Sequence, residues 1–465
     1  MLYQQIKTLA TPTYNVKQQV AAFTFSVNSA ADLSFASLAD MQAYVTKISN
    51  VNLADTVIQG MLGSDWTPVW GPVVWINPAQ QGTSLTADNT MACYYSPSQN
   101  LFVIAIAGTN PTSMFDWEKE DFDISSMVAW NTISPGSGSS STSGYISTGS
   151  SNGMNILLGM TAGGTSLLNA LQSYIQTNKI TGSTIAIGGH SLGGALAPCL
   201  GLYLFDNLAT LQLTGQNIAV YAYAGPTPGE QVFAKYYNGR INGTTFAYSS
   251  QFNTIDVVPM GSVLADLATI PNIYGSNISF GDTPVNTFTG IIATGLQLAS
   301  LEGGFSSGAP YTQVSTNLTS FTGAFNSDVY TNCSSKVAAL LADTKYLGVS
   351  STYLSELGGF VSFLYQAAAQ HGPAYCGGTI SLPLPEFSNL KNIWTSQPVT
   401  GALAIDDFTV EYQSNLANNP PQNATFESGV ARAIKHFTGI DLTNLQHVNK
   451  LDAVNQTGQQ ASQER

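Results

Sequence analysis

Charged side chains are scarce in this sequence of 465 residues. Asp, Glu, Lys and Arg together make up 9% of it, far below the roughly 25% that is typical of soluble domains. The 14 basic residues are outnumbered by 27 acidic ones, so the formal net charge is −13. A phosphate backbone would be repelled, and no basic cluster offsets this, so we expect no nucleic-acid partner.

Long apolar runs are also missing. No stretch of 18 or more apolar residues occurs, so the sequence predicts no transmembrane segment. Residues 1–20 carry no apolar run behind their first lysine and do not match a secretory signal peptide. The sequence does not identify the cellular compartment of the protein. The scarcity of charged residues weakly favours an extracellular protein.

Cysteine is rare and is not spaced for metal binding. The four cysteines have no C-x-x-C spacing, so no structural zinc site is expected. No H-E-x-x-H motif or other ligand cluster occurs, and we expect neither a metal nor another cofactor. Cys199 lies in an apolar run and should be a buried thiol. A disulfide between Cys333 and Cys376 stays undecided.

What the chain does have is 44% hydrophobic residues, enough for a sizeable core. The runs LFVIAIAG and IAVYAYAG predict buried strands at 101–108 and 218–225. Amphipathic spacing predicts a helix over 163–178, and a strand at 183–187 leads through a Gly-rich turn into a helix over 192–206. This alternation predicts an α/β fold with a mainly parallel central sheet and helices on both faces.

Three segments break the alternation. Residues 134–153 are so rich in Gly and Ser that we predict an unpacked loop. Residues 261–360 combine apolar helical stripes with Gly-rich joints. We predict that they form an inserted helical cap subdomain within a single catalytic domain over 1–465. Residues 380–465 are interpreted as a C-terminal extension whose polar end frays.

The central motif is G-x-S-x-G at 189–193. A serine nucleophile of the α/β-hydrolase type stands on a sharp turn between a strand and a helix, and flanking glycines relieve the crowding there. The five-residue pattern alone arises easily by chance. Here an apolar strand precedes it and small residues follow it. We therefore predict Ser191 as the nucleophile; the alternative is an ordinary β-to-α turn with a bystander serine.

Such a serine needs a carboxylate and a histidine base, which follow it in that order in this fold. Asp256 comes directly after the strand candidate 251–255, so we predict it as the carboxylate, with a turn or cap aspartate as the alternative.

Three of the four histidines lie after Asp256. His371 ends a helical pattern before Gly-Pro and so lies at a loop, where the base is expected. Its plainer alternative is a helix C-cap. His436, in a helix-like run, and His447, in a polar tail, remain alternatives. His190 adjoins Ser191 and cannot turn back onto it.

The oxyanion of the reaction needs two donors. The backbone N–H of Leu192, at the start of the predicted helix, is one. Thr109 follows the strand at 101–108 and could supply both its N–H and its hydroxyl as the second. The alternative for Thr109 is a turn threonine.

Together these motifs resemble the class 3 lipases, the fungal-type triacylglycerol lipase family of α/β-hydrolases. The resemblance implies Ser191, Asp256 and His371 as a catalytic triad, and Thr109 with Leu192 as the oxyanion hole. The matching stretches are AGT at 107–109, GHSLGGALA at 189–197, AYAGPTPG at 222–229, NTIDVVP at 253–259 and HGPAY at 371–375.

The sequence departs from that family in ways that bear on its substrate. Ala107 stands where the family usually has Arg, the gap of 115 positions between Asp256 and His371 is unusually long, and the tail is longer. Three functions stay open. The first is a lipase acting on long-chain esters at a lipid interface, the second is a non-interfacial carboxylesterase or phospholipase with the same triad, and the third is a catalytically inactive binding module.

The predicted partner is therefore a lipid or another ester. Contact with a lipid interface would be transient, and a neutral surface would not repel the net negative charge. The family carries a lid after the strand at 101–108, and apolar residues on such a flap would bind lipid when it opens. The same residues could instead belong to the core. They are Met114, Phe115, Trp117, Met127 and Trp130.

Overall fold

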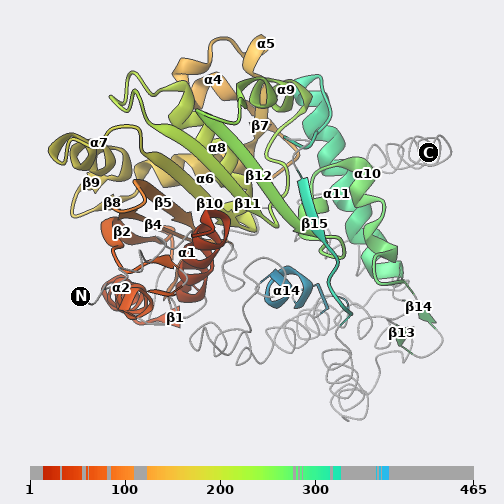
Figure 1. Cartoon of the computed structure of the whole chain (residues 1–465). Helices are drawn as coiled ribbons and strands as arrows, with labels where there is room; N and C mark the ends of the chain where they lie inside the picture. Colours follow the sequence, from red (N-terminus) through yellow and green to blue (C-terminus); the bar gives the residue numbers. More distant parts are fainter. Residues whose placement is uncertain are drawn as a thin grey trace, which may run out of the picture.

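A seven-stranded, mainly parallel sheet lies at the centre of the computed structural model, in the order β15-β12-β11-β10-β5-β4-β2 (Figure 1). The first five strands are mutually parallel, and β4 and β2 add an antiparallel edge. The predicted α/β fold class is confirmed. The structure describes residues 14–31, 34–54, 59–60, 62–80, 85–108, 123–275, 279–280, 283–284, 286–314, 318–325, 363, 366–367 and 369–375.

The sheet strands follow the apolar runs of the sequence. They are β2 (Thr67–Trp75), β4 (Asn89–Ser96), β5 (Leu101–Ile106), β10 (Thr184–His190), β11 (Asn217–Tyr223), β12 (Phe246–Asn253) and β15 (Leu318–Phe321). Short pairs lie outside this sheet: β1 (Ser34–Phe35) with β3 (Leu85–Thr86), β6 (Met127–Ala129) with β7 (Tyr145–Ser147), β8 (Thr161–Ala162) with β9 (Thr165–Ser166), and β13 (Ser279–Phe280) with β14 (Thr283–Pro284).

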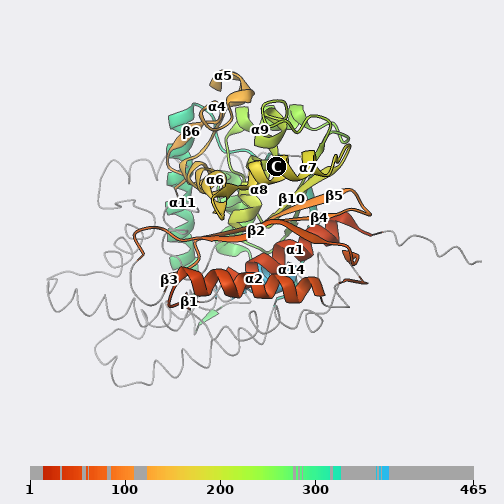
Figure 2. The same cartoon turned by 90° about the vertical axis from the view of Figure 1, so that its left-hand side faces the viewer.

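Helices cover both faces of the sheet (Figure 2). One face carries α1 (Val16–Ala31) and α2 (Leu38–Ala54). The other carries α6 (Thr148–Gly159), α7 (Leu167–Thr177), α8 (Leu192–Asp206) and α9 (Gln231–Arg240). The remaining short helices are α4 (Trp130–Ile133), η2 (Pro135–Ser137), α5 (Ser140–Ser143), η3 (Val258–Met260), α10 (Leu264–Leu267), η4 (Ile270–Asn272) and α14 (Pro373–Tyr375), and the long α11 spans Asn286–Ser307.

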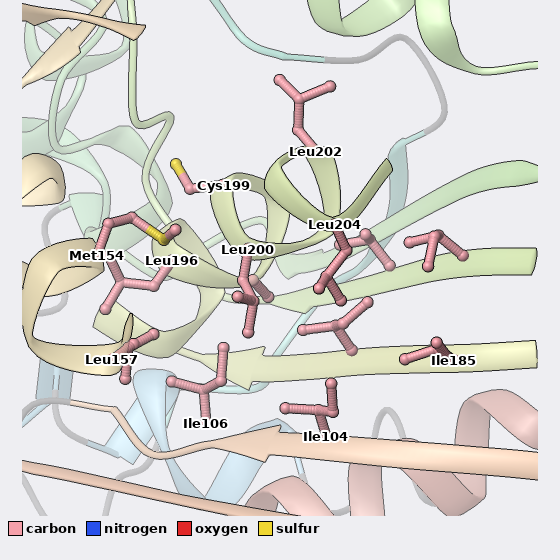
Figure 3. Packing of buried hydrophobic residues seen from close by; sticks show 14 of the residues in the cluster. Ile104, Ile106, Met154, Leu157, Ile185, Leu196, Cys199, Leu200, Leu202 and Leu204 are labelled. Carbon is pink, nitrogen blue, oxygen red and sulfur yellow. The ribbon is translucent and has the colours of Figure 1, made fainter. Parts of the chain in front are cut away.

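Strand β10 contributes side chains to two hydrophobic cores, one on each face of the sheet. Successive side chains of a strand point to opposite faces. Ile185 and Ile187 therefore pack under α8, whereas Ala186 packs towards α1. Leu200 and Leu204 of α8 extend towards the strands on the same side as Ile185 and Ile187 (Figure 3). A strand that is buried on both faces has a continuous apolar sequence, and this feature of the sequence predicted the strand.

The prediction of an unpacked loop at 134–153 is wrong. The segment follows α4, folds into η2, α5 and β7 and starts α6, with several of its serines and glycines buried. Ser147 caps α6 by accepting a hydrogen bond from the N–H of Ser150 at 2.9 Å. A Cβ on Gly144 would lie 2.2 Å from the nitrogen of Phe233. Small residues here allow close backbone packing instead of flexibility.

The insertion at 261–360 is described only in part. It contains α10, η4 and α11, but also the short pair β13–β14 and the strand β15, which pairs in parallel with β12 and extends the central sheet. The predicted helical subdomain therefore also includes strands. Its role as a cap stays a prediction, and the extension at 380–465 lies outside the described residues.

Cys93 and Cys199 are buried free thiols whose pKa values are raised by burial. The buried thiol predicted at Cys199 is thus confirmed, whereas Cys333 and Cys376 lie outside the described residues. None of the described helices combines the length and the apolarity needed to cross a bilayer.

Candidate active site

Ser191 is the single residue that connects the end of β10 to the start of α8. Its backbone has φ 59° and ψ −125°, a left-handed conformation that is strained for a residue with a side chain. Two hydrogen bonds hold it there. Its N–H donates to the carbonyl of Tyr223 at 3.0 Å, and its carbonyl accepts from the N–H of Ala195 at 3.1 Å. The turn is therefore fixed by the ends of β11 and α8.

The flanking glycines are required by close backbone contacts. A Cβ on Gly189 would lie 1.8 Å from the carbonyl oxygen of Gly193. A Cβ on Gly193 would lie 2.6 Å from the carbonyl oxygens of both Ile106 and Ala107. A larger residue at 189 would force the turn apart from the first turn of α8, and one at 193 would push α8 away from the end of β5.

An aspartate and a histidine pair at the same end of the sheet. Strand β12 ends at Asn253, and Asp256 follows in a turn, completely buried. The Nδ1 atom of His371 lies 2.8 Å from Oδ2 of Asp256. The other carboxylate oxygen accepts the N–H of Val258 at 3.0 Å. His371 ends a short helical stretch before Gly372.

Tyr375 completes this cluster, and the sequence analysis assigned it no role. Its hydroxyl donates to Oδ2 of Asp256 at 2.8 Å and accepts the N–H of Asn253 at 2.8 Å. Burial and the nearby Asp256 carboxylate raise its pKa well above its usual value. Two signals in the sequence could have pointed to it: it stands four residues after His371, and it ends the stretch HGPAY that carries the family resemblance.

Among the described residues, the second nitrogen of the His371 ring, Nε2, is buried and has no hydrogen-bond partner. Ring packing places His371 beside His190, the residue before Ser191: the two ring centroids lie 4.5 Å apart. Catalytic hydrogen bonds are often long without substrate and close when it binds.

Comparison with known proteins adds an independent finding. The family model for Lipase (class 3) matches residues 103–264, which include Ser191 and Asp256. The resemblance to the class 3 lipases is confirmed. This match supports a lipase-type carboxylic ester hydrolase. No relative was found among curated proteins.

The chain is similar to solved structures of lipases. The M37 lipase is 22% identical, with a TM-score of 0.59, and the match covers 82% of this chain and 99% of that one. The Rhizomucor miehei lipase–propeptide complex is 18% identical, with a TM-score of 0.35 and coverage of 53% and 64%. The lipase from Rhizopus microsporus var. chinensis is 14% identical, with a TM-score of 0.34 and coverage of 54% and 70%. The fold conclusion rests on the first.

As in the class 3 lipases, the oxyanion donors are expected beside the serine. Leu192 is the first residue of α8, and a first-turn N–H has no partner within its helix. A Cβ on Gly108 would lie 2.9 Å from Cβ of Ser191, so the chain leaving β5 passes the serine. Thr109 comes next and lies outside the described residues, as do His436 and His447.

The segment in which the resemblance predicts a lid is only partly described. Met114, Phe115 and Trp117 lie outside the described residues. Trp130 is completely buried, and its ring N–H donates to Asp206 at 3.2 Å, so it belongs to the core. Met127 is half-buried in β6. Within the described ranges, no three His, Cys, Asp or Glu side chains are grouped to hold a metal.

Proposed function

We propose that this protein hydrolyses carboxylic esters of lipids, of the triacylglycerol type, through an acyl-enzyme on Ser191. One observation carries the proposal: a strained serine on a strand-to-helix turn lies at the same end of the sheet as His371, which is hydrogen-bonded to the buried Asp256. The class 3 lipase match over this region supports the lipid ester as substrate.

The geometry suits nucleophilic acyl transfer. The carboxylate of Asp256 keeps the proton of the neutral ring on Nδ1, so Nε2 presents a lone pair. Nε2 accepts the Ser191 proton as Oγ attacks the ester carbonyl, and returns it to the departing alcohol. Water then repeats these steps on the acyl-enzyme and releases the fatty acid. The backbone N–H of Leu192, with Thr109, would stabilise the oxyanion.

Substitution of the triad tests this directly. Ser191→Ala should reduce ester hydrolysis by roughly 10⁴-fold or more while leaving the fold intact, and His371→Ala should cost a comparable factor because triad members act as a unit. His436→Ala and His447→Ala are the controls and should keep most activity. A folded Ser191→Ala protein with near-normal turnover would contradict the proposal, and an inactive His436→Ala alone would reassign the base.

The substrate class is tested separately. A panel of p-nitrophenyl esters of increasing chain length, long-chain triglycerides and phospholipids should show turnover of the long triglycerides. Hydrolysis restricted to short soluble esters would favour a carboxylesterase with the same triad, and preference for phospholipids would favour a phospholipase. No hydrolysis, with no reaction of Ser191 towards a fluorophosphonate, would favour a binding module.

A further inference from the structure

The histidine of the candidate triad is weakly restrained by the chain itself. His371 lies 115 positions after Asp256, a longer separation than the class 3 lipases usually have. A long connection restrains the approach of its two ends less than a short one does. Contacts from other elements must therefore fix the backbone that carries the imidazole.

Two buried side chains bind that backbone. His190, at the end of β10, lies with its Nε2 2.7 Å from the carbonyl oxygen of His371. Asn253, at the end of β12, donates from Nδ2 to the carbonyl oxygen of Gln370 at 3.0 Å. His190 is 3% exposed and Asn253 is completely buried. Consecutive carbonyls of the loop are thus held from two strands of the central sheet.

The surroundings of His190 suit a hydrogen-bond donor and not a catalytic base. Its ring packs against those of Phe25, His371 and Tyr375, at centroid distances of 5.1, 4.5 and 5.4 Å. Burial and the neighbouring His371 lower its pKa well below its usual value. The ring is neutral at pH 7, and a carbonyl can only accept, so the ring proton lies on Nε2. That nitrogen is occupied and cannot serve Ser191.

Asn253 connects the same loop to two further segments. Its Oδ1 accepts the N–H of Gly323 at 2.8 Å and that of Ile255 at 3.2 Å. Its Nδ2 also reaches Oε1 of Gln370 at 2.9 Å. The side-chain amide of Asn253 therefore joins three segments by hydrogen bonds: the end of β12, the chain after β15 and the segment that carries His371.

We infer that His190 and Asn253 are positioning residues that hold the backbone of residues 370–371 and so keep the His371 imidazole between Asp256 and Ser191. This inference rests on the proposed function, because it assigns the two residues a task only if His371 is the base.

The test compares His190→Leu with His190→Gln in the full chain. Leu fills the space without a donor, whereas Gln can place an N–H near the position of Nε2. A displacement of the catalytic base by about 1 Å lowers turnover by roughly 100-fold. His190→Leu should therefore lower kcat on that scale with little change in KM. His190→Gln should restore most of it. The low-field proton resonance of the His371–Asp256 hydrogen bond should weaken in the Leu variant and persist in the Gln variant.

A matched control lies at the other end of β10. The buried amide of Gln216 accepts the N–H of Ser183 at 2.9 Å and donates to the carbonyl of Ile180 at 3.3 Å. Gln216→Leu removes a similar backbone contact far from the site, so it should lower stability and leave kcat unchanged. If His190→Leu does not fold, Asn253→Ser removes the other amide donor and should show the same loss of kcat and of the proton resonance.

The outcomes separate the two proposals. Normal kcat in His190→Leu, or in Asn253→Ser, would overturn the inference while an inactive Ser191→Ala left the proposed function standing. Equal losses of kcat in His190→Leu and Gln216→Leu, with no recovery in His190→Gln, would also overturn it. The loss would then follow from the removal of any buried polar contact, and not from the position of His371. Turnover that survives Ser191→Ala would instead overturn the proposed function itself.

Discussion

At the scale of single residues, the site depends on one carboxylate with several donors. Oδ2 of Asp256 accepts hydrogen bonds from Nδ1 of His371 and from the hydroxyl of Tyr375, both at 2.8 Å, and Oδ1 accepts the N–H of Val258. A buried carboxylate with this many partners has little freedom to rotate. The direction in which it holds the imidazole is therefore set by its other donors.

Tyr375→Phe tests that statement. The substitution removes one donor from Asp256 and leaves the N–H of Asn253 without its acceptor. A hydrogen bond to a charged group contributes about 1.5–3 kcal/mol, so we expect kcat to fall by roughly tenfold or more, with a lower free energy of unfolding. Chemical denaturation and steady-state kinetics measure both. Unchanged kcat would show that Asp256 orients His371 without the tyrosine.

The sequence predicted some residues of the candidate site and not others, for a physical reason. Ser191, Asp256 and His371 stand in local patterns: a strand followed by a turn, or a helix end followed by Gly-Pro. Tyr375 and Asn253 matter through contacts across 122 and 117 positions. Such pairings follow from how strands and loops assemble, which spacing along a single chain does not reveal.

At the scale of elements, the serine turn depends on α8 packing directly on the chain after β11. Gly194 of α8 and Gly225 touch backbone to backbone, because a Cβ on Gly225 would lie 2.2 Å from the carbonyl carbon of Gly194. Backbone atoms cannot move aside as a flexible side chain can. The position of α8, and hence of Ser191, rests on this contact.

Gly225→Ala should therefore destabilise the protein by about 1–3 kcal/mol, the usual range for overpacking, and should lower activity by displacing the serine turn. Gly239→Ala is the matched control, because a Cβ there meets nothing within 4 Å. In an exposed helical position that change should leave stability unchanged or raise it by up to about 1 kcal/mol. Thermal unfolding of both variants checks the pair, and equal stability would contradict the account.

Element prediction succeeded where burial leaves a pattern. The strands β5, β10 and β11 were predicted by apolar runs, and α7 by its amphipathic spacing. The prediction failed at 134–153, where small polar residues pack tightly and resemble a flexible loop. It also missed β15, whose four residues LTSF are mostly exposed at the sheet edge, with Leu318 42% exposed. An edge strand of this length carries neither an apolar run nor clear alternation.

At the scale of the whole molecule, the insertion is tied to segments that leave the ends of the central strands. Gln313 of the insertion donates from its side-chain amide to the carbonyl of Pro259 at 3.4 Å, shortly after Asp256. The hydroxyl of Tyr311 donates to the carbonyl of Ile124 at 3.0 Å, on the segment that leads into β6. Helix α11 runs beside α10 (Figure 1) and also contacts η4 and β6. These ties support our proposal that the insertion forms a cap that narrows the acyl pocket.

Leu296→Trp probes that cap. Leu296 is buried in α11, within the segment 288–301 that we propose faces the acyl chain. A bulkier side chain there should shift preference towards shorter acyl chains while sparing p-nitrophenyl acetate. A chain-length profile of p-nitrophenyl esters measures the shift. An unchanged profile, for this and for similar substitutions along 288–301, would place the pocket elsewhere.

The central claim is that Ser191 carries the acyl group, and the site of covalent labelling tests it most directly. The full-length protein would be treated with a fluorophosphonate, digested, and mapped by mass spectrometry while residual ester hydrolysis is followed. The account predicts one adduct per chain, on Ser191, formed in step with the loss of activity. An adduct on another residue, or full activity in protein labelled at Ser191, would contradict it.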